Sequence, residues 1–397
     1  MSQILEGIRV LDFSRYVAGA YAGMLLADVG AEVIRVERPG GAEDREIGPL
    51  APNGESLPFA LILQRNKKSI TLNLLTKQGE KLLSQLVERS QVVIHNFAPG
   101  SGEAKALDYN TLAQIKEDIV VAAISGFGQY GPYAHRPCFD SIAQAMAGGM
   151  CFTGFPGNPP TKAGVLYIDL CTGLHAALGI MFALYNCQKT GVGQMIDIAL
   201  FDVATSCLNS LGVGAEYKLS GATRPQIGNH AFYTFGDSFK AKDGWVMLSA
   251  PGNSIWKRFI RVLGKKELAQ AQEFSDDMAR FQNRELIRPV VSAWVAERTV
   301  DEVVKILDQA RVPCGPVNTI VDMVADPQLQ AREMIVDVEY PGIGNITLPG
   351  LAMKLSRTPG KIYKRPPKLG EHSHEIFCGL VGLSHEDFSE LKSQGMV

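Results

Sequence analysis

The chain has 397 residues, of which 46% are hydrophobic and 20% are charged, and its formal net charge is −2. This length and balance predict a soluble globular protein of two or three domains. The near-neutral charge offers no basic face for DNA or RNA and does not suggest a membrane surface, so neither is expected as a partner.

Compartment and membrane signals are weak. The opening MSQILEGIRVLDFS has no basic region followed by a long apolar run, so no signal peptide is expected. The most apolar stretch, 170–187, is only marginally long enough for a membrane span, and a buried helix is the favoured interpretation. Seven cysteines without a CxxC pair argue against a disulfide framework or a zinc site. Together these features predict a cytoplasmic protein with reduced thiols.

The first half of the chain alternates strand and helix patterns. Helices are expected at 19–29 and after Thr76, Ser141 and Asp169. Strands are expected at 8–13, 32–37, 69–74, 91–97, 119–125 and 194–199. These strand runs are rich in Val and Ile and show little alternation, which is typical of a sheet covered on both faces. The alternation therefore predicts a Rossmann-like α/β domain with a parallel sheet.

The pattern changes after a helical run at 200–219. Residues 233–250 predict antiparallel strands with a turn at 242–244, and helices are expected at 255–263 and 300–309. The prediction is a large Rossmann-like domain formed by residues 1–200 and 330–397. A smaller α+β domain at 225–325 is joined to it by two linkers, at 201–224 and 326–329.

Residues 126–131 read GFGQYG directly after an expected strand, a literal match to the glycine fingerprint of dinucleotide-binding folds. The context does not fit that fingerprint. Pro132 follows at once, no amphipathic helix comes next, and no acidic residue lies about 20 residues beyond to hold a ribose. No NAD or flavin is therefore expected, and the segment is interpreted as a loop at a sheet edge.

Several segments, taken in order, resemble the class III coenzyme A transferases, the family of formyl-CoA, carnitine and glutarate CoA-transferases. The resemblance covers almost the whole chain. Its segments are LEGIRVLDFSRYVAGAYAGMLLADVGAEVIRVERPGG near the start, RNKKSITLNL at 65–74, NFAPG at 96–100, SGFGQYGP at 125–132, FDSIAQAMAG at 139–148, KAGVLYIDLCTGLHAALG at 162–179, TGVGQMIDIALFD at 190–202, KAKDGWVMLSAPGN at 240–253 and LGEHSHEIF at 369–377.

The resemblance implies that Asp169 is a catalytic nucleophile. It would attack an acyl-CoA thioester to give a mixed anhydride, and the thiolate would return to form an aspartyl-CoA thioester. The acceptor acid would then attack, and the thiolate would capture the acceptor's acyl group. From spacing alone Asp169 reads as a helix N-cap, and both roles are compatible because a helix N-terminus also stabilises an anion.

The same resemblance implies the remaining site residues and an interlocked homodimer, whose large domain binds coenzyme A. No tightly bound cofactor and no metal are expected; the partners are an acyl-CoA, a small carboxylic acid and a second copy. The expected coenzyme A contacts are Val17, Ala18, Arg38, Leu72, Asn73, Asn96, Phe97, Lys105, Arg136 and Phe139. The expected acid-substrate contacts are Arg15, Asp140, Gly252 and Asn253.

Some positions depart from the family pattern. At Lys105 the basic contact of the family is displaced by one residue or lost, and only Gly252 remains of a four-glycine loop. Val17 and Gly48 do not suit an oxalate or formate substrate. Arg15 is predicted to pair with the far carboxylate of a dicarboxylate such as succinate or glutarate.

Two other functions are alternatives to coenzyme A transfer. An α-methylacyl-CoA racemase shares the implied fold but needs paired acid and base groups, and its histidine position is occupied here by Phe139. An inactive partner subunit would be expected to have lost the nucleophile, and Asp169 is intact. A metal pair of His372 and His374 is disfavoured because an i, i+2 spacing does not share one helix face.

Overall fold

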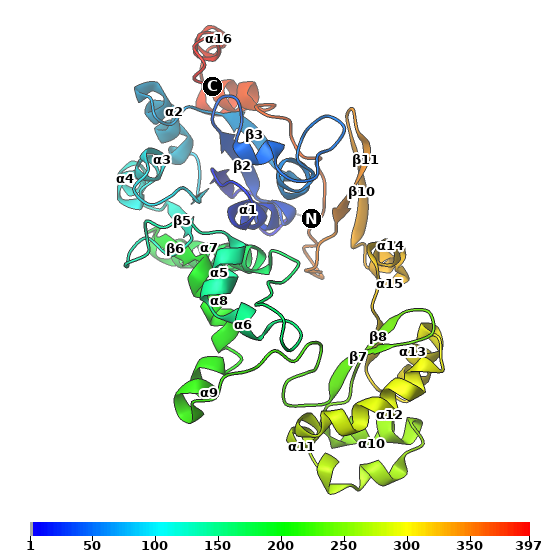
Figure 1. The fold of residues 1–397 in the computed structure, drawn as a ribbon. Coiled ribbons are helices and arrows are strands. Elements are labelled where there is room, and N and C mark those ends of the chain that lie inside the picture. Colours follow the sequence, from blue (N-terminus) through cyan, green and yellow to red (C-terminus); the bar gives the residue numbers. More distant parts are fainter. Residues whose placement is uncertain (1–2) are drawn as a thin grey trace. The chain divides into compact units, whose positions relative to one another are not determined.

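The computed structural model describes residues 3–397, and the chain divides into two compact units (Figure 1). The first unit contains the chain up to Gly149, Lys162–Thr223 and Gln328–Val397. The second contains Met150–Thr161 and Arg224–Pro327. This division differs from the sequence-based boundaries in two respects. Met150–Thr161 groups with the second unit, and the expected linker at 201–224 is largely helical.

A six-stranded sheet forms the centre of the first unit, with the strand order β3-β2-β1-β4-β5-β6 and every neighbouring pair parallel. This arrangement confirms the predicted α/β fold. The strands are β1 (Arg9–Asp12), β2 (Glu32–Glu37), β3 (Lys68–Thr71), β4 (Val92–His95), β5 (Val120–Ser125) and β6 (Met195–Ala199). From β1 the chain adds strands β2 and β3 on one side of the sheet, and from β4 it adds β5 and β6 on the other side. The position between β1 and β4 is therefore a topological switch point, and ligands of open α/β sheets bind beyond the carboxyl ends of the strands at such a point.

Successive strand residues point to opposite faces of the sheet, and both faces are covered. On one face, Val10 belongs to a core cluster with α1 (Ala18–Asp28), α7 (Tyr167–Thr190) and α8 (Leu200–Asn209). On the other, Leu11 packs in a cluster with α2 (Lys77–Glu88), α4 (Tyr109–Ile115) and the C-terminal segment. This double coverage explains why the strand sequences are apolar without alternation.

The remaining elements of the first unit are short. They are η1 (Glu43–Glu46), η2 (Leu57–Leu61), η3 (Ile62–Gln64), α3 (Gly102–Ala106), α5 (Asp140–Met146), α9 (Val213–Ser220), a β10 (Ile335–Tyr340) and β11 (Gly344–Pro349) hairpin, η6 (Glu375–Val381) and α16 (His385–Ser393). Helices α6 (Gly149–Phe152) and α15 (Pro327–Ala331) lie at the boundaries between the units.

The second unit is a small α+β body with its own core around Phe235, Trp256 and Phe259. Strands β7 and β8 pair antiparallel around the predicted turn, where the Ala241 N–H donates to the Gly244 carbonyl. Its elements are β7 (Gly236–Lys240), β8 (Trp245–Ser249), β9 (Cys314–Pro316), α10 (Gly252–Val262), η4 (Lys266–Ala269), η5 (Gln272–Phe274), α11 (Asp277–Gln282), α12 (Arg284–Ala296), α13 (Val300–Gln309) and α14 (Ile320–Ala325).

Two helix predictions need correction. The run at 200–219 is two helices, because Gly212 adopts a φ of +75° and breaks it between α8 and α9. Helix α7 begins at Tyr167, so Asp169 lies inside its first turn and is not its N-cap.

Candidate active site

The loops that follow β1 and β4 meet at the reversal in strand order. The Asn96 side chain joins them, because its Oδ1 accepts from the Arg15 N–H at 2.9 Å and its Nδ2 donates to the Arg15 carbonyl at 2.7 Å. Tyr16 follows with a φ of +61°, a conformation that costs free energy for a residue with a side chain. Its N–H donates to the Asp44 carboxylate at 2.8 Å, and its ring packs edge-on against Phe139.

Asp169 lies in the first turn of α7 and is 9% exposed. Among the described residues, no hydrogen bond to its carboxylate is found. Its carboxylate lines a cavity of about 260 Å³ together with Val17, Ala18 and Phe139. A buried carboxylate that faces a cavity without a bound donor is poised to act on a ligand rather than to cap its own helix.

Asp140 performs the capping of α7 instead. Its Oδ2 accepts from the N–H groups of Ile168 at 2.8 Å and Asp169 at 3.3 Å, and Gln144 donates to its Oδ1. Asp140 is buried, 1% exposed, and it does not line the cavity. The structure therefore places this predicted substrate contact behind Asp169, where it holds the helix start and adds a second negative charge.

Burial, and then the neighbouring Asp140 carboxylate, raise the pKa of Asp169 from 3.8 to about 7. Both causes disfavour the charged form, since a buried carboxylate loses hydration and two like charges repel. A carboxyl group with a pKa near neutral pH is more basic, and so a stronger nucleophile once ionised, than one that titrates near 4.

The pH dependence of transfer follows from this shift. If Asp169 is the nucleophile that the resemblance implies, only its ionised form can attack, so kcat/KM is expected to rise with pH through about 7 and to level above it. Asp140→Asn keeps an oxygen to cap α7 but removes the charge that helps to raise the pKa of Asp169. Its profile should move to lower pH in a stopped assay between pH 5 and 9. An unchanged midpoint in this variant would show that Asp140 does not tune Asp169.

Helices α1 and α7 approach closely beside the cavity. A side chain at Gly173 would place its Cβ 2.5 Å from the Ala18 carbonyl oxygen and 3.0 Å from the Tyr21 ring, so only glycine permits this contact. The approach brings the first turn of α1 next to that of α7. The amides of a first helical turn lack intrahelical partners and point toward anions, so Val17 and Ala18 are suited to stabilise a developing oxyanion.

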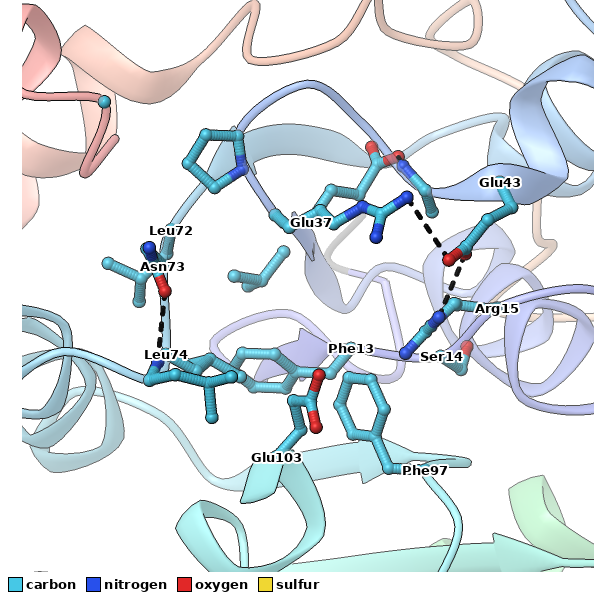
Figure 2. A pocket seen from close by; sticks show the side chains of 16 residues that line it. Phe13, Ser14, Arg15, Glu37, Glu43, Leu72, Asn73, Leu74, Phe97 and Glu103 are labelled. Atoms are coloured by element: carbon cyan, nitrogen blue, oxygen red, sulfur yellow. Dashed lines mark hydrogen bonds and ion pairs between the residues drawn. The ribbon is translucent and has the colours of Figure 1, made fainter. Parts of the chain in front are cut away.

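Two further cavities continue from the one at Asp169 along the carboxyl ends of the strands. A cavity of about 270 Å³ shares Tyr16, Asn96 and Phe97 with it. The largest, about 570 Å³, shares Arg15, Phe97 and Glu103 with the second cavity. Figure 2 shows the largest cavity, with Phe97 and Glu103 on one side and Leu72 and Asn73 on another. These three neighbouring cavities of the first unit, which share lining residues, are together called the trough.

The trough brings together most of the predicted coenzyme A contacts. Those that line the largest cavity are Arg38, Leu72, Asn73 and Phe97, and those that line the Asp169 cavity are Val17, Ala18, Asn96, Phe97, Arg136 and Phe139. Lys105 on α3 is exposed and lines none of these three cavities, whereas Glu103, two residues earlier, lines two. Its predicted contact is therefore not seen here.

The charges of the largest cavity are partly paired. Glu43 binds Arg15 at 2.9 Å and Arg38 at 3.2 Å, and Figure 2 shows the bond to Arg15. The Arg15 guanidinium also lies 4.8 Å from the centre of the Phe97 ring. Arg15 thus lines the two outer cavities and not the one that holds Asp169.

Gly252 and Asn253 belong to the second unit, at the start of α10. The Gly252 N–H donates to the Asp277 carboxylate at 2.9 Å, and Arg280 donates to the Asn253 side chain. The Gly252 N–H is therefore occupied within its own unit. The contact of these two residues with the acid substrate stays a prediction.

Local structure explains why glycine is required at positions of the GFGQYG segment. A Cβ at Gly126 would lie 2.3 Å from the Cβ of Cys138, and Gly128 has a φ of +88°. The N–H of Gln129 donates to the Asp197 carboxylate on β6, and Gly126 lines the Asp169 cavity. The glycines serve tight packing and turning in a loop beside the site, as interpreted, but this loop follows the inner strand β5 and not an edge strand.

Comparison with known proteins shows which family has this fold and sequence. Residues 5–373 match the model of a family described as CoA-transferase family III. The chain is 35% identical over 396 residues to succinyl-CoA–D-citramalate CoA-transferase from Chloroflexus aurantiacus, covering 99% of this chain and 98% of that protein. It is 35% identical over 419 residues to formyl-CoA:oxalate CoA-transferase from Streptomyces avermitilis, covering 100% of both. The crystal structure of a CAIB/BAIF family protein from Brucella suis matches with a TM-score of 0.81 at 33% identity, covering 96% of this chain and 100% of that one.

Proposed function

Since the chain belongs to CoA-transferase family III and so transfers coenzyme A from an acyl-CoA to a carboxylic acid, we propose that Asp169 is the nucleophile of this transfer. The observation that carries the proposal is the position of Asp169. It is the only acidic side chain that the described residues contribute to the inner cavity of the trough.

In this mechanism the Asp169 carboxylate attacks the thioester carbonyl of the donor and displaces the coenzyme A thiolate, which leaves a mixed anhydride. The thiolate then attacks the aspartyl carbonyl, forms an aspartyl-CoA thioester and releases the donor acid. The acceptor carboxylate attacks that thioester, and the thiolate finally captures the acceptor's acyl group and regenerates Asp169. The amides of Val17 and Ala18 are the donors placed to stabilise the oxyanion of each step.

The trough supports a direction for the bound acyl-CoA. Its outer cavity offers Arg15 and Arg38 for phosphates and the Phe97 ring for a base, while its inner end holds Asp169. We place the nucleotide outside and the thioester inside. The racemase alternative finds no support at Phe139, whose ring packs against Tyr16 with the centroids 5.4 Å apart.

We further propose a dicarboxylic acid as acceptor. Succinate, D-citramalate and oxalate, which appear in the names of the two relatives, all carry a second carboxylate. Arg15 lines only the two outer cavities, whereas Arg136 lines the cavity of Asp169 with its guanidinium over the rings of Tyr133 and Phe127. Arg136 is therefore assigned to the far carboxylate in preference to Arg15.

Arg136→Ala is expected to raise KM for dicarboxylate acceptors roughly 10-fold or more, because a charge-assisted pair contributes about 1.5–3 kcal/mol. KM for monocarboxylates should change little. Arg15→Ala serves as the matched control and should affect acyl-CoA binding equally for every acceptor. A rise in the KM of acyl-CoA alone in Arg136→Ala would assign this residue to coenzyme A instead, and a selective dicarboxylate effect in Arg15→Ala would restore that residue's predicted role.

We propose that the chain acts as a homodimer in the cytoplasm. Leu174, Leu178, Phe182 and Tyr185 form an exposed apolar stripe along α7, with exposed fractions between 46% and 64%. Helix α7 is long and apolar enough to cross a membrane, but its opposite side is part of the sheet core, which favours a protein partner over lipid. All seven cysteines are free, which suits a reducing compartment. Sedimentation of the purified protein tests the dimer.

The function itself is tested with a panel of acyl-CoA donors and carboxylic acids, followed by mass spectrometry of the products. Hydroxylamine added during turnover should convert the enzyme thioester or anhydride to a hydroxamate at Asp169. Modification at another carboxylate would reject the proposed nucleophile while leaving the transfer reaction in place.

A further inference from the structure

Three side chains near the C-terminus converge away from the trough. The ligand atoms of His374, Cys378 and His385 all lie within 4.8 Å of one another. His374 Nε2 and His385 Nδ1 are 2.7 Å apart, and the two rings stack with their centroids 4.8 Å apart. We propose that these residues bind a Zn²⁺ ion, which fastens the C-terminal helix to the rest of the first unit.

The donor set suits this metal. Two imidazoles and one thiolate are ordinary zinc ligands, and three protein ligands leave a fourth position for water. Bond lengths of about 2.0–2.1 Å to nitrogen and 2.3 Å to sulfur set the ligand separations of a tetrahedral site at about 3.3–3.6 Å. The two histidine nitrogens, 2.7 Å apart, are closer than that range, and no pair of ligand atoms exceeds 4.8 Å, so the side chains must shift to bind one ion.

The backbone explains why the three residues meet. Cys378 follows His374 by four residues, so the two share one side of the helical segment that includes η6. Gly382 then adopts a φ of +91°, and the chain reverses into α16, whose first residue is His385. Phe377 and Phe388 are buried in the core on either side of this turn, and Phe388 packs edge-on against the His374 ring.

His372 and His374, the two histidines disfavoured as a metal pair, have different neighbours. His372 Nδ1 accepts from the Ser69 N–H at 3.2 Å and so belongs to the edge of β3. His374 instead lies close to Cys378 and His385. The cluster begins just beyond residue 373, where the match to the family model ends, so the site is proposed for this chain and not for the family.

Metal binding at this cluster would also affect the acyl-CoA trough. After α16, Gly395 lines the outer cavity, and the Met396 carbonyl accepts from the N–H of Asn73, which lines the same cavity. A metal that holds the start of α16 therefore holds one wall of the cavity assigned to the nucleotide. The ion lies outside the lining of the Asp169 cavity and takes no part in the transfer reaction.

The test uses the full-length, untagged protein, freed of metal with a chelator and titrated with Co²⁺ and Zn²⁺. One equivalent of Co²⁺ should give a thiolate-to-metal charge-transfer band and the absorption of tetrahedral cobalt, and Zn²⁺ should displace it. At about 100 times its dissociation constant, Zn²⁺ should raise the melting temperature by about 5 °C. It should also lower KM for acyl-CoA several-fold with kcat unchanged.

Cys378→Ser should remove the charge-transfer band, and His385→Gln should weaken cobalt binding at least 10-fold. Both positions lie at or near the surface, and circular dichroism checks that each variant folds. Cys151→Ser changes an exposed cysteine elsewhere and should keep the full spectrum. The proposal is overturned if the wild-type protein gives no thiolate band, which would leave a hydrogen bond between two histidines, or if Cys378→Ser keeps that band.

Discussion

The substitution Asp169→Asn is expected to abolish coenzyme A transfer and to raise the thermal stability of the protein at pH 8. The loss should reach at least about 1,000-fold, because an amide cannot form the anhydride and no other acidic side chain among residues 3–397 lines the inner cavity. The gain in stability has a separate cause. The substitution removes a buried charge that receives no hydrogen bond from the described residues.

The sign of the stability change follows from the pKa of Asp169, which is about 7 in the folded protein against 3.8 ordinarily. Between these values the folded state holds the proton more tightly, so the free energy of unfolding falls as pH rises from about 4 to 7. With about 1.4 kcal/mol for each pKa unit, the ionised carboxylate costs on the order of 4 kcal/mol above pH 7. Asparagine avoids this cost.

Calorimetry of both proteins at pH 5 and pH 8 measures the effect. Asp169→Asn should raise the melting temperature by several degrees at pH 8 and by less at pH 5. Asp140→Asn is the matched control, since it removes a neighbouring buried carboxylate that is not the proposed nucleophile and should retain transfer activity. A stabilisation that is equal at both pH values would mean that the Asp169 charge is not its cause.

The sheet of the first unit could be predicted from the sequence because its signal is local. In the run 119–125 every residue except Ser125 is apolar, and only a strand covered on both faces has that composition within a Rossmann-like pattern. Asp169 was found through ordered family segments, since its spacing alone suggested a helix cap.

The supporting residues could not be predicted, because their roles depend on contacts between distant segments. Asp140 caps a helix that begins 27 residues later, and that contact displaces the cap role once considered for Asp169. Tyr16 lines two cavities and has a positive φ, which its residue type does not predict. The only sequence signal for its role is its position between Arg15 and Val17, two predicted contact residues. The cluster around Cys378 likewise requires a chain reversal at Gly382.

Lys67→Met is expected to destabilise the first unit by about 3–5 kcal/mol, the usual effect of leaving one member of a buried ion pair alone. Lys67 Nζ lies 2.8 Å from the Asp12 carboxylate, and both side chains are at most 1% exposed. Burial lowers the pKa of Lys67 even though Asp12 opposes that change. The ammonium is thus costly to bury, and its loss strands the Asp12 charge at the end of β1.

The pair also supports the active-site loop. Asp12 Oδ1 accepts from the N–H and hydroxyl of Ser14, the residue before Arg15, and Gly23 on α1 leaves the space in which the two charges meet. A stranded Asp12 should therefore disturb the loop that carries Tyr16 and Val17. The KM for acyl-CoA should rise along with the loss of stability.

A double-mutant cycle with urea unfolding separates these causes. Asp12→Asn keeps an oxygen for Ser14 but carries no charge, so Asp12→Asn/Lys67→Met should recover about 2 kcal/mol relative to Lys67→Met. Lys68→Met is the matched control, because Lys68 pairs with the partly exposed Glu32 and Glu375 and its loss should cost about 1 kcal/mol or less. If the double variant is no more stable than Lys67→Met, the cost lies in the lost packing and in the bond from Lys67 to the Ala20 carbonyl, and not in the unpaired charge.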